Sequence, residues 1–111
     1  MNMKPNSIQA CCAHEPLAAK FAALSHPARI EILRHLAGLE TACCCKDVVS
    51  HLDLAQSTVS QHLKILVEAG LVRFTPDRQR SRYEVDRQEL AALSGSVARL
   101  LDFSAAGATG E

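Results

Sequence analysis

Residues 47–66 read DVVSHLDLAQSTVSQHLKIL, which we interpret as a short helix, a turn and a longer helix. In the longer helix, Val59, Leu63 and Leu66 recur at the spacing of an apolar stripe that faces a core. The face that this stripe leaves free carries small polar side chains, as does a helix that lies in the major groove of DNA. With residues 53–55 as the turn, the segment predicts a helix-turn-helix that binds DNA.

Side chains that could contact DNA lie on this polar face and in a basic segment that follows it. Glutamine can hold adenine edges, serine or threonine can contact any base or phosphate, and arginine contacts phosphate or enters the minor groove. Between Arg73 and Arg82 there are four arginines against one acid, Asp77. The DNA-binding candidates are Gln56, Ser57, Thr58, Ser60, Gln61, His62, Lys64, Arg78, Arg80 and Arg82.

Three more helices are predicted around this segment. Apolar spacing predicts helices over residues 17–24 and 28–37, and Pro27 suits the first turn of the second one. The short helix of the helix-turn-helix is expected to begin near Thr41 or Cys44 and to reach about Leu52. Downstream, Asp86 is a good N-cap for a last helix that reaches about Phe103.

Two β-prone runs, residues 71–75 and 83–85, flank a polar turn and predict a hairpin. The expected fold is therefore mainly α with a small β-hairpin, a winged helix-turn-helix. We expect a flexible N-terminal segment over 1–16 that carries Cys11-Cys12, a winged-helix domain over 17–103, and a disordered tail over 104–111. The first and last helices have apolar stripes without an obvious internal partner, which a symmetric homodimer would cover.

Composition restricts the class of protein. The 111 residues carry no net charge and 48% hydrophobic residues, of which few are aromatic. No apolar run approaches the length of a membrane span, and residues 1–10 lack the apolar core of a signal peptide. We therefore expect a cytoplasmic protein without a membrane partner, where thiols stay reduced. Its five cysteines, in two tight clusters, are then metal ligands or redox groups rather than structural disulfides.

The chain resembles the ArsR/SmtB family of winged-helix metalloregulatory repressors, of the arsenic-responsive type. The resemblance rests on residues 24–33, 56–66 and 69–72, and on the arginine-rich wing that ends at Tyr83. It implies a homodimer joined by its first and last helices. Such a dimer binds a promoter palindrome, represses transcription, and releases the DNA when a ligand binds, so that a resistance operon is expressed. It also implies that the protein is not an enzyme.

Members of the arsenic and cadmium type carry a Cys-Val-Cys-Asp box at the start of the third helix. Aligned on Asp47, Cys44 takes the place of the first box cysteine and Lys46 that of the second. Because this departure leaves the box incomplete, other thiols must complete the site. The resemblance points to neighbouring cysteines and to N-terminal ones, often from the partner subunit.

The candidate metal ligands are Cys11, Cys12, Cys43, Cys44 and Cys45. Soft thiolates select soft ions, and three thiols suit arsenite or antimonite, the inducers that we expect, with no organic cofactor. Four thiols, or three with an imidazole, suit cadmium, lead or zinc. The helix start should lower the pKa of the nearby thiols.

Several alternatives stay open at this point. The same fold could sense cadmium, lead, zinc or a thiol oxidant, with a site inside one subunit or between two. A thiol-based redox enzyme or a metal carrier is a different class of protein. Against that class, the sequence has no Cys-x-x-Cys motif, no glycine-rich loop that forms a pocket, and no defensible pair of nucleophile and base.

Overall fold

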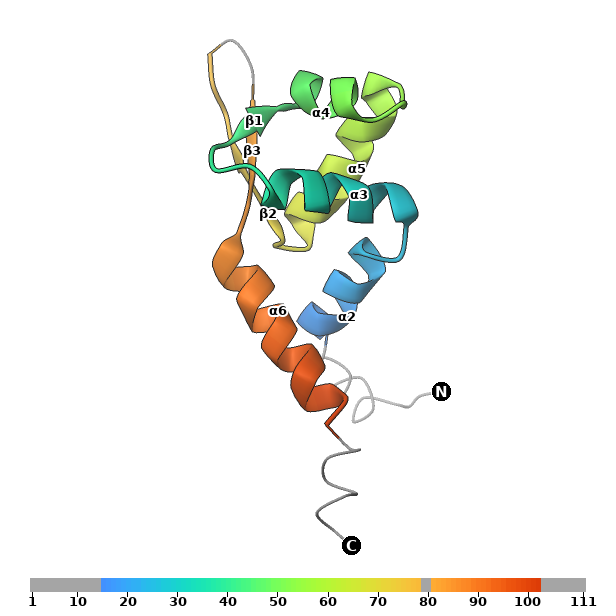
Figure 1. Cartoon of the computed structure of the whole chain (residues 1–111), viewed down its shortest axis with the longest axis vertical. Coiled ribbons are helices and arrows are strands. Elements are labelled where there is room, and N and C mark those ends of the chain that lie inside the picture. The colour runs from blue at the N-terminus through green and yellow to red at the C-terminus, as the bar shows by residue number, and fades with distance from the viewer. Residues whose placement is uncertain (1–14, 79–80, 103–111) are drawn as a thin grey trace, which may run out of the picture.

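The computed structural model describes residues 15–78 and 81–102, in which five helices and a small sheet form a winged helix (Figure 1). The elements in chain order are α2 (Glu15–Ala23), α3 (Pro27–Ala37), β1 (Cys43–Cys44), α4 (Cys45–His51), α5 (Gln56–Glu68), β2 (Val72–Thr75), β3 (Arg82–Val85) and α6 (Arg87–Leu100). Helix α2 begins two residues before the predicted start, so Glu15 and Pro16 are helical. The rest of the predicted N-terminal segment, and the predicted tail, lie outside the described residues.

Helices α3 and α6 begin at residues whose side chains cap them. His26, directly before Pro27, caps α3. Its Nδ1 atom accepts a hydrogen bond from the Ala28 N–H at 3.1 Å. Asp86 caps α6 as predicted, with Oδ1 accepting from the Glu89 N–H at 3.1 Å.

The apolar stripe of α5 forms the centre of the core. Val59, Leu63 and Leu66 are each fully buried, which confirms the predicted periodicity. They belong to one hydrophobic cluster with Ile32 of α3 and Val48 of α4. Burying such a side chain stabilises a fold by about 1.5–3 kcal/mol, so this cluster fixes α5 between its neighbours.

The sheet has three strands in the order β1-β3-β2, all antiparallel. The predicted hairpin is β2 with β3. The additional strand β1 was not predicted, and it pairs Cys43 with Tyr83 and Cys44 with Arg82. A strand of two residues is too short to show the alternation by which strands are recognised in a sequence. This pairing places the cysteine cluster against the wing.

A tight turn leads from α5 into the wing. Gly70 has φ 87°, the left-handed conformation that favours glycine. The Gly70 N–H donates to the Val67 carbonyl at 3.0 Å and the Leu71 N–H to the Leu66 carbonyl at 3.1 Å, the Schellman pattern of helix ends. The turn therefore sets the direction of the wing relative to α5.

Helices α2 and α6 lie together at the end of the molecule opposite the tip of the wing (Figure 1). Lys20 of α2 and Glu89 of α6 form an ion pair at 3.4 Å between them. Within the described ranges, no helix has the length and the apolar character that crossing a membrane requires.

Candidate thiol site and nucleic-acid interface

Helix α5 presents its polar face to solvent. The exposed side chains of this face are Gln56, Ser57, Thr58, Ser60, Gln61 and Lys64, all of them predicted DNA contacts. Helix α4 packs against α5 across the turn, as in a helix-turn-helix. The geometry thus leaves these six side chains accessible to a groove of DNA.

His62 does not belong to this face, contrary to prediction. It is only 8% exposed, and its ring lies 4.6 Å from that of His26. The guanidinium Nη1 of Arg29 is 3.4 Å from its Nδ1 atom, and Arg29 also donates to the Ala23 carbonyl at 2.6 Å. His62 lies at the edge of the buried apolar stripe of α5, so its side chain turns inward toward α3. We therefore no longer count it among the DNA contacts.

Burial, followed by the charges of His26 and Arg29, lowers the pKa of His62. His62 is therefore neutral in the folded chain at pH values where an unfolded histidine, with a pKa of about 6.5, is already protonated. Because the unfolded chain takes up this proton first, His62 stabilises the fold above that pKa and loses this contribution as the pH falls below it. We expect urea denaturation to give a smaller free energy of unfolding at about pH 5.5 than at about pH 7.5. The His62→Gln variant should show a weaker dependence on pH, and an equal dependence in both chains would contradict the assignment.

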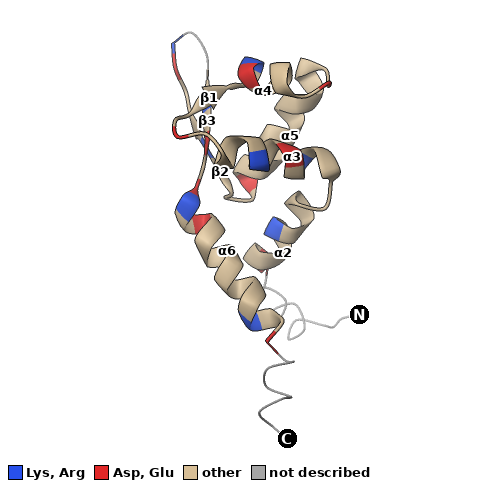
Figure 2. Cartoon of the chain, in the orientation of Figure 1, with Lys and Arg blue, Asp and Glu red and all other residues tan. Residues whose placement is uncertain are grey.

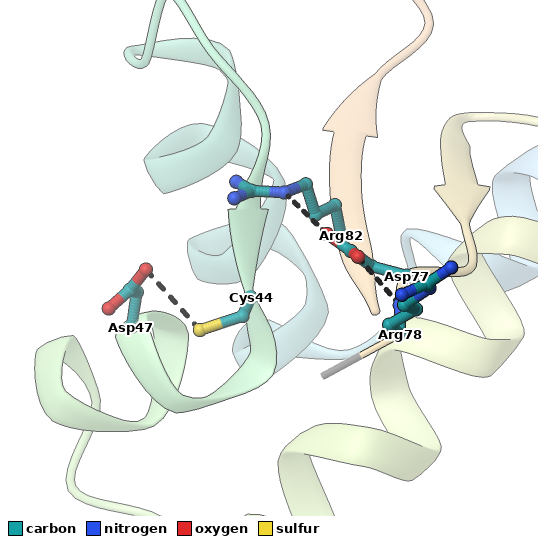
Figure 3. Close-up of polar contacts among 5 residues, drawn as sticks. All are labelled: Cys44, Asp47, Asp77, Arg78 and Arg82. Carbon is teal, nitrogen blue, oxygen red and sulfur yellow. Dashed lines mark hydrogen bonds and ion pairs between the residues drawn. The ribbon is translucent and has the colours of Figure 1, made fainter. Parts of the chain in front are cut away.

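Two arginines of the wing contact one aspartate. Asp77 accepts a hydrogen bond from the Arg78 N–H at 2.6 Å, and Arg82 Nε lies 3.4 Å from its other oxygen (Figure 3). The side chains of Arg78 and Arg82 are exposed, as DNA contacts require. Arg80 lies outside the described residues. Figure 2 shows a basic and an acidic stretch side by side in the outer part of the wing, and acidic and basic residues are interspersed elsewhere.

The three central cysteines are not equivalent. Cys43 is 7% exposed and belongs to the hydrophobic core cluster. Cys44 is only 4% exposed; it is the N-cap residue of α4, and its Sγ donates to Asp47 Oδ2 at 3.4 Å (Figure 3). Cys45, the first residue of α4, is partly buried. The side chains of consecutive strand residues point to opposite faces of the sheet, so those of Cys43 and Cys44 lie in different surroundings.

Cys44 and Cys45 open into a pocket of about 470 Å³ that Cys43 does not line. The pocket joins α4 to the helix predicted to read DNA and to the wing. Its lining residues are Cys44, Cys45, Lys46, Gln56, Ser60, Ser81 and Tyr83. Two exposed side chains of α5 therefore form a wall of the space that these thiols face.

The expectation that the helix start lowers the thiol pKa is wrong for two of the cysteines. Burial, with further contributions from Asp47 and the adjacent thiols, raises the pKa of Cys43 to about 11. Burial also raises the pKa of Cys45, and Cys44 adds to that increase. A helix of seven residues offers a weak dipole, which desolvation outweighs.

The described residues do not contain a complete metal site. Within 15–78 and 81–102, no three side chains of His, Cys, Asp or Glu are arranged to hold an ion. Cys11 and Cys12 lie outside the described residues. The chemistry of the donors still fits a soft ion, because two thiols line one pocket. An ion bound there would need only further ligands to complete its coordination.

Sequence reasoning missed two contributors to this region. Tyr83 lies 38 positions after Cys45 in the chain, yet both line the same pocket. Arg29 joins the end of α2 to α5 through its contacts with Ala23 and His62. Both residues make contacts with parts of the chain that are distant in sequence, and no local sequence pattern indicates such contacts. Only the position of each residue within a recognisable motif could have drawn attention to it.

Comparison with known proteins identifies the family. Residues 26–73 match the family described as bacterial regulatory proteins of the arsR family. A probable mercury resistance operon repressor of Streptomyces lividans is 36% identical over 84 residues, 74% of this chain and 65% of that protein. The arsenical resistance operon repressor of Bacillus subtilis is 34% identical over 74 residues, which cover 67% of this chain and 70% of that protein. The chain thus spans about two thirds of the length of these relatives.

A solved structure agrees with these matches. An ArsR-like transcriptional regulator from Rhodococcus sp. RHA1 superimposes with a TM-score of 0.73 at 26% identity, over 87% of this chain and 91% of that one. The winged-helix fold and the resemblance to the ArsR/SmtB family are both confirmed. The chain therefore belongs to the arsR family of bacterial regulatory proteins, a family of transcriptional regulators and not of enzymes.

Proposed function

We propose that this protein is a homodimeric repressor that binds promoter DNA and leaves it when arsenite or antimonite binds cysteine thiolates. Release of the DNA would allow expression of a resistance operon in the cytoplasm. One observation carries the proposal: Cys44 and Cys45 open into a pocket that Gln56 and Ser60 of α5 also line. A ligand bound to these thiols therefore lies directly against the helix that reads DNA.

For arsenite, which exchanges three hydroxides, we propose a set of three thiolates in which Cys11 or Cys12 joins Cys44 and Cys45. Arsenous acid exchanges its hydroxides for thiolates: an As–S bond forms, an As–O bond breaks, and the thiol proton leaves with the hydroxide as water. No base and no oxidant is required. Drawing the N-terminal cysteine to α4 shifts this helix and α5, which packs on it. Repression ends because the ion binds the DNA-incompetent arrangement more tightly.

Dimerisation is proposed through α2 and α6. Phe21 of α2, with Leu100 and Leu101 at the end of α6, are large apolar side chains that remain exposed in the single chain. These two helices lie side by side, away from the wing (Figure 1). A second copy related by two-fold symmetry would cover this surface and place two α5 helices on the two half-sites of a palindrome.

Mercuric ion is a second candidate inducer. A relative that is 36% identical is a probable mercury resistance operon repressor, and the two thiols of the pocket are soft ligands. Fluorescence anisotropy of a labelled promoter duplex, titrated with arsenite, antimonite, mercury, cadmium, lead and zinc side by side, tests the class and the inducer together. Absence of binding to the promoter would overturn the repressor assignment, and the ion that releases DNA at the lowest concentration identifies the inducer.

DNA contacts should divide into two kinds. Gln61, at the centre of the exposed face of α5, should read a base edge, so Gln61→Ala should weaken operator binding by roughly 5- to 150-fold and random DNA far less. Arg78, on the wing, should neutralise a phosphate, so Arg78→Ala should weaken binding to both DNAs alike. It should also reduce the slope of log affinity against log salt by about 1. Equal losses on operator and random DNA for Gln61→Ala would contradict this division.

A further inference from the structure

Two pockets lie on either side of one tyrosine. The thiol pocket lies between α4, α5 and the wing. A second pocket, of about 520 Å³, lies between α5 and the wing and is lined by Ser60, Gln61, Lys64, Val67, Glu68, Phe74 and Tyr83. Ser60 and Tyr83 belong to both linings. They form a common wall between the thiols and a surface that contains three of the predicted DNA contacts.

Tyr83 contacts both sides of this wall. In β3 it is paired in register with Cys43 of β1 and with Phe74 of β2. Its ring lies 5.4 Å from that of Phe74, at an angle of 52°, within the range of favourable aromatic pairs. On the other side Tyr83 lines the thiol pocket together with Cys44 and Cys45. Tyr83 is half-buried, whereas Phe74 is 45% exposed at the edge of the second pocket.

Apart from the carboxylate of Glu68, the second pocket has the composition of a groove that faces DNA. Lys64 can contact a phosphate, Gln61 and Ser60 can donate hydrogen bonds, and the exposed Phe74 ring offers an apolar surface to a sugar or a thymine methyl group. Phe74 and Tyr83 were not among the predicted DNA contacts. The shape of this groove depends on the position of the two rings, which form one of its walls.

We propose that Tyr83 is the positioning residue that transmits the occupancy of the thiol pocket to the DNA-facing groove. An ion held by Cys44 and Cys45 takes space against the Tyr83 ring. The ring then shifts toward Phe74, and the groove loses the shape that accepts the DNA backbone. This inference rests on the proposed function, since it assigns the route by which the inducer weakens DNA binding.

The test measures the coupling factor, the ratio of the operator dissociation constants with and without saturating arsenite. In the native chain this factor should lie between about 5 and 150. Tyr83→Leu, which removes the ring and keeps an apolar strand residue, should bring the factor close to one while arsenite still binds, as measured by titration calorimetry. Tyr83→Phe keeps the ring and should retain most of the native factor. Glu84→Gln, on the same strand but paired with Arg73 at 3.9 Å, is the matched control and should respond as the native chain does.

A second variant keeps the inference testable if Tyr83→Leu does not fold. Phe74 lines the second pocket and not the thiol pocket, and its ring pairs with that of Tyr83, so Phe74→Leu should also reduce the coupling factor. A native factor in both Tyr83→Leu and Phe74→Leu would overturn the inference and leave the proposed function standing. A factor of one in the native chain would overturn the proposed function itself, and the inference with it.

Discussion

Arsenite should no longer release operator DNA when Cys44 and Cys45 are both replaced by serine. The two thiols are the ones that share a pocket with Gln56 and Ser60, so their loss removes the ligands nearest to α5. Serine keeps the size of the side chain, can still donate to Asp47, and is a favoured N-cap residue, so α4 should form as before. Anisotropy of a labelled operator should show native affinity without arsenite and no change with it, in place of a loss of roughly 5- to 150-fold.

Cys43→Ala is the matched control for this result. Cys43 belongs to the core cluster and does not line the pocket, so its loss should lower stability by about 1 kcal/mol and leave the arsenite response intact. If Cys43→Ala abolished the response and the double serine variant kept it, the assignment of the pocket thiols would be wrong.

Replacing Leu63 by alanine should destabilise the fold more than any surface change. Leu63 has no exposed surface and lies in the middle of α5, which packs against α3, α4 and β2. Deleting a buried leucine side chain costs about 2–5 kcal/mol, a large share of the roughly 5–15 kcal/mol that stabilises a small domain. Urea denaturation at one fixed protein concentration should show this loss, because dimerisation links stability to concentration.

Lys64→Ala gives the comparison for Leu63→Ala. Lys64 is the next residue on the same helix, is exposed, and is replaced by a better helix former, so stability should change by less than about 0.5 kcal/mol. Its operator affinity should fall, because Lys64 lies on the face of α5 that we propose contacts DNA. A loss of stability in Lys64→Ala as large as that in Leu63→Ala would contradict the orientation of α5.

Local sequence patterns predicted most of the fold. The periodicity of Val59, Leu63 and Leu66 predicted the buried face of α5, and each of the three is fully buried. Asp86 predicted the start of α6, where it forms the cap. In both cases the determining interaction lies within a few residues along the chain, so the sequence contains the whole signal.

The candidate site was only partly predictable, because it depends on long-range contacts. The cysteines of the central cluster were predicted ligands, but their division into core and pocket follows from the pairing of β1 with β3. That pairing also brings Tyr83 to Cys45. His62 was misplaced because its polarity suggested an outward side chain, whereas Arg29 and His26 hold it inside. The raised pKa of Cys43 follows from the same burial.

If an ion bound to the cysteine thiols weakens DNA binding, operator affinity must depend on arsenite, and one comparison tests this directly. The dissociation constant of the native chain for its own operator is measured at constant salt, without arsenite and with arsenite at saturation. We expect arsenite to raise this constant by roughly 5- to 150-fold, and operator DNA to weaken arsenite binding by the same factor. Equal operator affinity in the two conditions, with arsenite shown to be bound, would contradict it.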